Sequence, residues 1–158
     1  MYKNKRKQLR LKNYDYKQNG LYFITICIQN RECLLSEIND EIAVYDAGEM
    51  VKEIWHNMPL YYNGVQVHEF VVMPNHIHGI IELTSSELTL STIIQRFKTL
   101  TTTKYINGVH HNSWQPFYKK LWQRNYYEHV IRDEKALVEI RNYIVNNPYN
   151  WKDDDLHP

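Results

Sequence analysis

Two extended segments joined at Pro74-Asn75 constrain the fold of this chain more than any other part of its sequence. Residues 65–73 alternate between two sets of side chains, and residues 76–83 are rich in isoleucine and leucine. Alternation with a period of two predicts a strand, and a Pro-Asn pair between two such runs favours a turn. We therefore expect an antiparallel hairpin over residues 65–83, from which the rest of a sheet is built.

The other segments predict further strands and helices. Residues 21–29 are rich in β-branched and aromatic side chains, whereas residues 40–58 repeat their apolar positions every three or four residues until Pro59. Ser85 or Ser86, and later Asp133, are suitable caps for two more helices. The expected strands are residues 21–29, 65–73, 76–83 and 124–131, and the expected helices are residues 40–58, 85–105 and 134–147.

This order is β-α-β-β-α-β followed by one additional helix. It is the split pattern of ferredoxin-like and RRM-like α+β domains, in which helices cover one face of an antiparallel sheet. A chain of 158 residues fits a single domain. We expect a basic arm over residues 1–12, a folded core over residues 13–151 and an acidic tail over residues 152–158.

Charge is distributed unevenly along the chain. Residues 1–12 hold six lysines and arginines and no acid, so the remaining residues sum to −5 within a net charge of +1. Such an arm favours phosphate backbones, although a solubilising segment would carry the same charge. Asp153, Asp154 and Asp155 indicate a solvated tail. The chain has only two cysteines, Cys27 and Cys33, and we expect both to be reduced thiols. Its apolar runs are too short to cross a membrane, which predicts a soluble, cytoplasmic protein.

His76 and His78 flank Ile77 at the start of the second hairpin strand. Because strand side chains alternate between faces, both imidazoles should point to one side and Ile77 to the other. Neutral imidazole is a common metal ligand, but two ligands do not hold a reactive metal, so a third is needed from elsewhere. Taken alone, such a pair is more often solvated or hydrogen-bonded than metal-bound.

Tyr143 and Asn147 lie four residues apart on the last expected helix. At about 100° per residue they share one flank of its apolar stripe. If this helix covers the sheet face that carries His76 and His78, Asn147 can offer a carbonyl oxygen to the same metal. Tyr143 would then point a hydroxyl nucleophile at whatever the metal polarises. Each residue also has an ordinary interpretation, as a packing tyrosine and as a helix terminator.

Four sequence blocks in this order resemble the single-tyrosine HUH transposases, and in particular their REP-associated tyrosine transposase branch. They are Met-Pro-Asn-His-Ile-His at 73–78, Arg-Phe-Lys at 96–98, Leu-Trp-Gln-Arg-Asn-Tyr-Tyr-Glu-His-Val-Ile-Arg at 121–132 and Tyr-Ile-Val-Asn-Asn-Pro at 143–148. The resemblance extends from about residue 21 to residue 151 and implies that His76 and His78 bind a divalent metal, Mg²⁺ or Mn²⁺. It also implies that Tyr143 is the nucleophile and Asn147 the third metal ligand.

The activity implied by this resemblance is cleavage and rejoining of single-stranded DNA that carries a hairpin. Tyr143 would form a 5′-phosphotyrosine and release a 3′-hydroxyl, and metal charge would offset the charge that develops on phosphate. A tyrosine with an ordinary pKa of about 10 needs help to lose its proton, and the sequence does not identify the group that helps. The protein would act as a monomer or a homodimer.

Candidate DNA contacts are basic and aromatic residues within the matching blocks. Base stacking and phosphate contacts are one interpretation, whereas aromatics packed in the core and a solvated basic helix face are the other. The candidates are Arg96, Lys98, Trp122, Arg124, Tyr126, His129 and Arg132.

Two other functions fit the same sequence. The β-α-β-β-α-β order also supports a non-catalytic single-stranded nucleic-acid-binding module, whose binding would survive chelators. A metal-dependent hydrolase that activates water would leave Tyr143 incidental.

Overall fold

The computed structural model describes residues 19–84 and 87–158. The basic arm and the Ser85 or Ser86 cap fall outside these residues. The strands are β1 (Gly20–Cys27), β2 (Ser36–Ile38), β3 (Ile42–Val44), β4 (Val65–Val72), β5 (His76–Leu83) and β6 (Tyr127–Ile131). The helices are α1 (Asp46–Tyr61), α2 (Leu90–His111) and α3 (Glu134–Asn146), with the short 3₁₀ helices η1 (Gln29–Arg31) and η2 (Asn147–Asp153).

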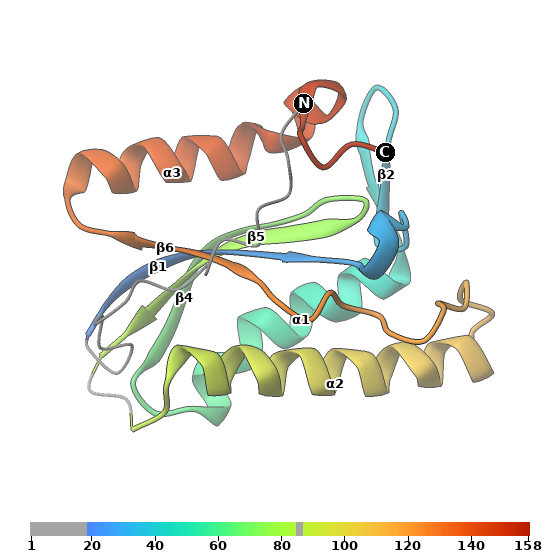
Figure 1. Cartoon of the computed structure of the whole chain (residues 1–158), viewed down its shortest axis with the longest axis horizontal. Coiled ribbons are helices and arrows are strands. Elements are labelled where there is room, and N and C mark those ends of the chain that lie inside the picture. The colour runs from blue at the N-terminus through green and yellow to red at the C-terminus, as the bar shows by residue number, and fades with distance from the viewer. Residues whose placement is uncertain (1–18, 85–86) are drawn as a thin grey trace.

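Four strands form one antiparallel sheet in the order β4-β5-β1-β6, which confirms the ferredoxin-like prediction. β4 and β5 are the expected hairpin, and β1 lies between β5 and β6. α1 and α2 lie on one side of this sheet and α3 lies on the other (Figure 1). The first two helices therefore share a face, as expected, and the additional helix covers the opposite face.

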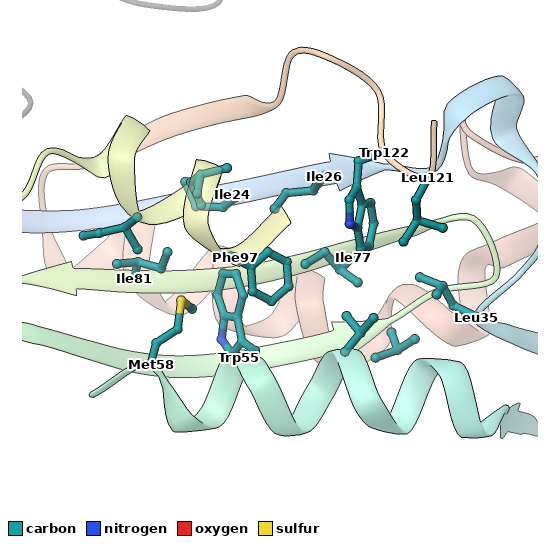
Figure 2. Packing of buried hydrophobic residues seen from close by; sticks show 14 of the residues in the cluster. Ile24, Ile26, Leu35, Trp55, Met58, Ile77, Ile81, Phe97, Leu121 and Trp122 are labelled. Atoms are coloured by element: carbon teal, nitrogen blue, oxygen red, sulfur yellow. The ribbon is translucent and has the colours of Figure 1, made fainter. Parts of the chain in front are cut away.

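The main core lies between the sheet and the pair α1 and α2. Ile24 and Ile26 of β1 and Ile77 of β5 pack there against Trp55 and Phe97, all of them buried (Figure 2). Figure 2 shows Trp122 among the same side chains. Because Ile77 points into this core, the histidines on either side of it point to the α3 face, as strand alternation requires.

Gly79 follows directly after His78 and allows close packing at this point of β5. A Cβ built on Gly79 would lie 2.3 Å from Cζ2 of Trp55, which is far inside van der Waals contact. The glycine therefore lets the indole of α1 rest against the strand that carries both histidines.

A smaller cluster holds α3 on the opposite face of the sheet. Leu137 and Ile144 of the helix pack against Phe23, Ile80 and Ile131. Asp133 caps the helix as predicted, because its carboxylate accepts a hydrogen bond of 2.8 Å from the backbone N–H of Ala136. The same face of the helix that packs on the sheet also brings its last turns over β5 and β1.

Several predicted boundaries are wrong for local reasons. The helix expected from residue 40 begins at Asp46, because β2 and β3 pair as a small hairpin just before it. Pro59 lies inside α1 and not after it, since a proline near a C-terminus disturbs only the bond to the preceding turn. α2 is capped by Thr89 and continues through Gly108, where the ring of Trp114 fills the space of the missing side chain.

Two further boundary differences lie near the candidate site. The fourth strand begins at Tyr127 and not at residue 124. α3 ends at Asn146, one residue before the expected end, and the chain continues directly into η2. Among the described residues, no helix is long and apolar enough to cross a membrane.

Candidate active site

His76 and His78 lie side by side on the α3 face of β5, both almost fully buried. Their Nε2 atoms are 3.1 Å apart. Nδ1 of His76 is 2.7 Å from Oδ1 of Asn75, and Nδ1 of His78 is 2.7 Å from the hydroxyl of Thr25 on β1. Each ring is therefore held in its orientation by a hydrogen bond at Nδ1, and the two Nε2 atoms point toward one another.

The hydrogen bonds restrict the tautomers of the two rings. The Asn75 amide nitrogen donates to backbone carbonyl oxygens of Leu156 and Arg31, so its oxygen is the atom that faces His76. His76 must then donate from Nδ1, which leaves a lone pair on its Nε2. The Thr25 hydroxyl can either donate or accept, so it is compatible with a proton on either nitrogen of His78.

Tyr143 and Asn147 meet this pair from the last turns of α3 and the start of η2. The ring centroid of Tyr143 lies 5.3 Å from that of His78 and 5.9 Å from that of Phe23. Asn147 is buried and lines one hollow together with His78 and Tyr143. The structure thus brings the four residues singled out in the sequence to one site.

Asp154 completes the cluster, although its position had indicated a solvated tail. Its carboxylate is 6% exposed, and Oδ2 lies 3.8 Å from Nε2 of His76. The expectation of a solvated tail is therefore wrong at this residue. Burial of Asp154 follows from long-range contacts that place the tail over the site: Asn75 donates to the carbonyl of Leu156 at 2.7 Å, and Trp151 packs on the ring of His76.

The donor atoms fit a divalent cation. One ligand atom each from His76, His78 and Asp154 lie within 4.8 Å of one another. Oδ1 of Asn147 and Oδ2 of Asp154 are buried and have no hydrogen-bond partner within the described residues. Leaving two such oxygens unpaired is costly unless a cation satisfies them. Mixed imidazole and oxygen ligands suit several divalent ions, so the donor set does not fix the metal.

The electrostatics of the site favour neutral imidazoles and a protonated tyrosine. Burial lowers the pKa of His76 to about 4, against the opposing effect of Asp154. Burial, and then the neighbouring His76, lower the pKa of His78 well below its usual range. Neutral imidazole is the form that binds metal. Burial raises the pKa of Tyr143, and Asp154 raises it further, while Asn147 opposes this effect.

A hollow of about 580 Å³ opens beside these residues. His78, Tyr143 and Asn147 line it together with Asp154. Cys27 also lines it, and burial raises the pKa of this thiol to about 11, so the thiol stays protonated at neutral pH. The hollow leads from solvent to the candidate nucleophile, as a site for a large substrate requires.

The structure separates the predicted DNA contacts into surface and interior residues. Arg124, His129 and Arg132 are exposed near β6, and Arg96 is exposed on α2. Their side chains are therefore available to a polyanion or a base. None of these four residues lines the hollow of about 580 Å³ that contains the metal-ligating group.

Trp122, Lys98 and Tyr126 take part in internal packing. Trp122 is 5% exposed within the main core (Figure 2). Its Nε1 donates to the hydroxyl of Thr101 at 2.8 Å, which favours the core-packing interpretation of this residue over base stacking. The Lys98 ammonium donates to the carbonyl of Gln123 at 2.8 Å, and burial lowers its pKa to about 8. Tyr126 is half-buried against the main core, with the Lys98 ammonium 5.7 Å from its ring centroid.

Comparisons with known proteins found one matching family and two similar proteins of the same organism. The family described as "Transposase IS200 like" matches residues 16–147. An uncharacterized protein of Haemophilus influenzae is 41% identical, with 96% of this chain and 93% of that protein covered. A second protein of Haemophilus influenzae, named "Putative REP-associated tyrosine transposase", is 29% identical, with 87% of this chain and 76% of that protein covered.

A solved structure also shares the fold. It is described as a REP-associated tyrosine transposase bound to a REP hairpin, and it superimposes with a TM-score of 0.67 at 22% identity. The match covers 89% of this chain and 73% of that one.

Proposed function

The chain belongs to the IS200-like transposase family, whose members act in DNA transposition. From this premise we propose that the protein cuts and rejoins single-stranded DNA through Tyr143. The observation that carries the proposal is the position of the tyrosine ring 5.3 Å from His78, at the edge of a cluster of metal-ligating atoms. A nucleophile beside a Lewis-acid site is the arrangement that phosphoryl transfer needs.

In the proposed step the Tyr143 hydroxyl oxygen attacks the scissile phosphorus. A bond forms between this oxygen and phosphorus, and the bond between phosphorus and the 3′ oxygen breaks. The phenolic proton leaves to solvent, and the 3′ oxygen takes up a proton to become a hydroxyl. The 5′-phosphotyrosine keeps the energy of the phosphodiester, so the reverse attack by a 3′-hydroxyl rejoins a strand.

His76, His78, Asn147 and Asp154 are the residues that would hold the metal. Mg²⁺ or Mn²⁺ bound there would supply positive charge, which would stabilise the developing charge on phosphate and favour the ionised tyrosine. Within the chain, burial and the Asp154 carboxylate both oppose ionisation of Tyr143. The negative charge of Asp154 is therefore compatible with ionisation of Tyr143 only when a cation offsets that charge. This supports the proposal that the site works in its metal-bound form.

The proposed substrate is single-stranded DNA with a hairpin. The solved structure with this fold is described as bound to a REP hairpin, and exposed arginines at positions 96, 124 and 132 offer phosphate contacts here. His129 is exposed as well and can contact a base or a phosphate. α3 packs on the sheet of its own chain, so Tyr143 and the metal-ligating residues come from one subunit, and the protein acts as a monomer or a homodimer in this proposal.

The test is formation of a covalent adduct with hairpin-bearing single-stranded oligonucleotides and Mn²⁺. We expect intact-protein and peptide mass spectrometry to place a DNA fragment on Tyr143. Tyr143→Phe should give no adduct, because it lacks the attacking oxygen. Tyr149→Phe is the matched control: this tyrosine is 85% exposed and should be dispensable.

Two outcomes would overturn the proposal. A covalent adduct that persists in Tyr143→Phe would exclude this residue as the nucleophile. A free 5′-phosphate product from Tyr143→Phe would show that water is the nucleophile and that the protein is a metal-dependent hydrolase. Binding without cleavage, unaffected by chelators, would instead identify a non-catalytic binding module.

A further inference from the structure

A second, smaller hollow lies next to the candidate active site, between α3 and the edge strand β6. Its volume is about 320 Å³. Phe23, Tyr127 and Tyr143 line both this hollow and the one that contains the metal-ligating group, so the two hollows adjoin at these side chains. DNA whose scissile phosphate is at Tyr143 would therefore place its neighbouring nucleotide at this second hollow.

The lining of the second hollow suits a flat aromatic group. Tyr127 is 46% exposed and Tyr143 is 48% exposed, so parts of both rings face solvent. Phe23 meets each of them edge to face, with centroids 6.3 Å and 5.9 Å away, which fixes the two rings from below. Ile140 adds an apolar wall. Base stacking on such tyrosines tolerates any base, because every base has a π-face.

The polar groups of this hollow disfavour phosphate and favour a base edge. Glu139 and His129 line it, and lysine and arginine are absent from its described lining. A carboxylate repels phosphate but accepts N–H donors. Guanine, adenine and cytosine present an exocyclic amino group, and guanine adds a ring N–H beside it. Thymine presents carbonyl oxygens on both sides of its single ring N–H.

We propose that this hollow binds the nucleobase adjacent to the scissile phosphate, with Tyr127 stacking on the base and Glu139 accepting from its amino group. The site discriminates against thymine and favours guanine, which can donate two hydrogen bonds to one carboxylate. This inference rests on the proposed function, because it requires a scissile phosphate at Tyr143. Tyr127 and Glu139 are positioning and specificity residues and take no part in bond making.

The test uses a hairpin-bearing single-stranded oligonucleotide library with randomised flanks, incubated with Mn²⁺. Covalent adducts are isolated, and both the attached and the released fragments are sequenced. For the wild type we expect one position next to the cut to be depleted of thymine by about tenfold, from the 1–3 kcal/mol typical of base-edge hydrogen bonds. Glu139→Gln should abolish this depletion and leave preferences at other positions intact. Glu134→Gln, on the same helix but outside the hollow, should behave as the wild type.

Stacking is tested with Tyr127→Ala on a fixed oligonucleotide. The adduct yield of this variant should fall by about tenfold when the nucleotide next to the cut carries the base that the wild type prefers. The yield should change little when the same nucleotide is abasic. Tyr127→Phe should retain the wild-type yield, because it keeps the ring. A thermal unfolding midpoint equal to that of Tyr127→Phe shows that the alanine variant is folded.

The outcomes separate the two proposals. If the wild type forms no adduct, the proposed function and this inference fail together. If the wild type forms adducts but Glu139→Gln keeps the same thymine depletion, or Tyr127→Ala loses as much yield on the abasic strand, only the inference fails.

Discussion

Replacing Thr25 by valine should weaken metal binding without touching a metal ligand. The Thr25 hydroxyl lies 2.7 Å from Nδ1 of His78, directly across the β1–β5 pair. In the metal-free protein, the two Nε2 atoms are 3.1 Å apart and His76 keeps a lone pair there, so a hydrogen bond between the rings puts the proton of His78 on Nε2 and lets Nδ1 accept from the threonine. To bind a metal, His78 must move its proton to Nδ1 and donate to Thr25. Valine has the same shape and a high β propensity, but its side chain can neither donate a hydrogen bond to Nδ1 nor accept one from it.

The size of this effect follows from burial. Thr25 is 7% exposed and His78 is 3% exposed, so water does not replace the lost partner. Loss of a partner behind a ligating histidine typically weakens metal affinity by about 10- to 100-fold, or about 1.4–2.7 kcal/mol. In the metal-free protein, leaving one buried polar nitrogen unpaired costs about 1–3 kcal/mol of unfolding free energy. That loss would lower the melting temperature by several degrees, at about 2–4 °C per kcal/mol for a domain of this size.

Isothermal titration with Mn²⁺ and urea unfolding in EDTA measure the two effects separately. Thr25→Ser is the matched control, because it keeps the hydroxyl and loses only a methyl group. We expect serine to retain most of the metal affinity and valine to lose at least tenfold. The reasoning would be refuted if valine bound Mn²⁺ within twofold of the wild type, or if serine lost as much affinity as valine.

Three further predictions concern the same region. Asp154→Asn should weaken Mn²⁺ binding by about 10- to 100-fold in the same titration while hardly changing the fold, because the carboxylate charge is lost and the shape is kept; unchanged affinity would exclude Asp154 as a ligand. Gly79→Ala should destabilise the protein by about 1–3 kcal/mol in urea unfolding, because its Cβ would overlap Trp55; a neutral result would show that the indole can shift. In EDTA, stability should fall as pH drops from about 6.5 toward 4, by about 1.4 kcal/mol per pH unit for each buried histidine, since the unfolded chain binds protons that folded His76 and His78 do not. A flat profile in urea unfolding between these pH values would contradict the burial of neutral imidazoles.

Local pattern predicted the parts of the site that depend on one element at a time. The alternation of His76, Ile77 and His78 assigned the two imidazoles to one face of a strand, and the four-residue spacing of Tyr143 and Asn147 placed both on one flank of a helix. These relations follow from backbone geometry alone. That the two elements meet on one face of the sheet depends on the tertiary fold, which the motif order indicated.

Asp154 shows what local pattern cannot predict. Three consecutive aspartates after a helix have no periodicity, and such a run normally remains solvated. The middle one is buried because Asn75, 81 residues earlier than Leu156, donates a hydrogen bond to the carbonyl of that residue. A signal was present in Asn75, which lies inside the histidine motif, but its partner could be identified only in three dimensions.

For a similar reason, the sequence did not decide whether the side chain of Trp122 is buried or exposed. Its neighbours in sequence are basic and aromatic, which suits both a nucleic-acid surface and a strand with one buried face. The distinction depends on Thr101 of α2, which accepts the indole N–H inside the main core. The residues near Trp122 in the sequence do not identify a hydrogen-bond partner that a distant helix contributes.

The small cluster under α3 divides the molecule into units of different local stability. The histidines belong to a central strand of the main sheet, whereas Tyr143 belongs to a helix held by Leu137, Ile144 and one ion pair between Arg141 and Glu69. Few buried contacts imply a low free energy of local opening, so amide hydrogens of α3 should exchange earlier than those of β1 and β5. A cation shared by His78 and Asn147 would join the two units. Slower exchange confined to α3 and η2 would then report metal binding, and the nucleophile would be ordered at the moment when the site can use it.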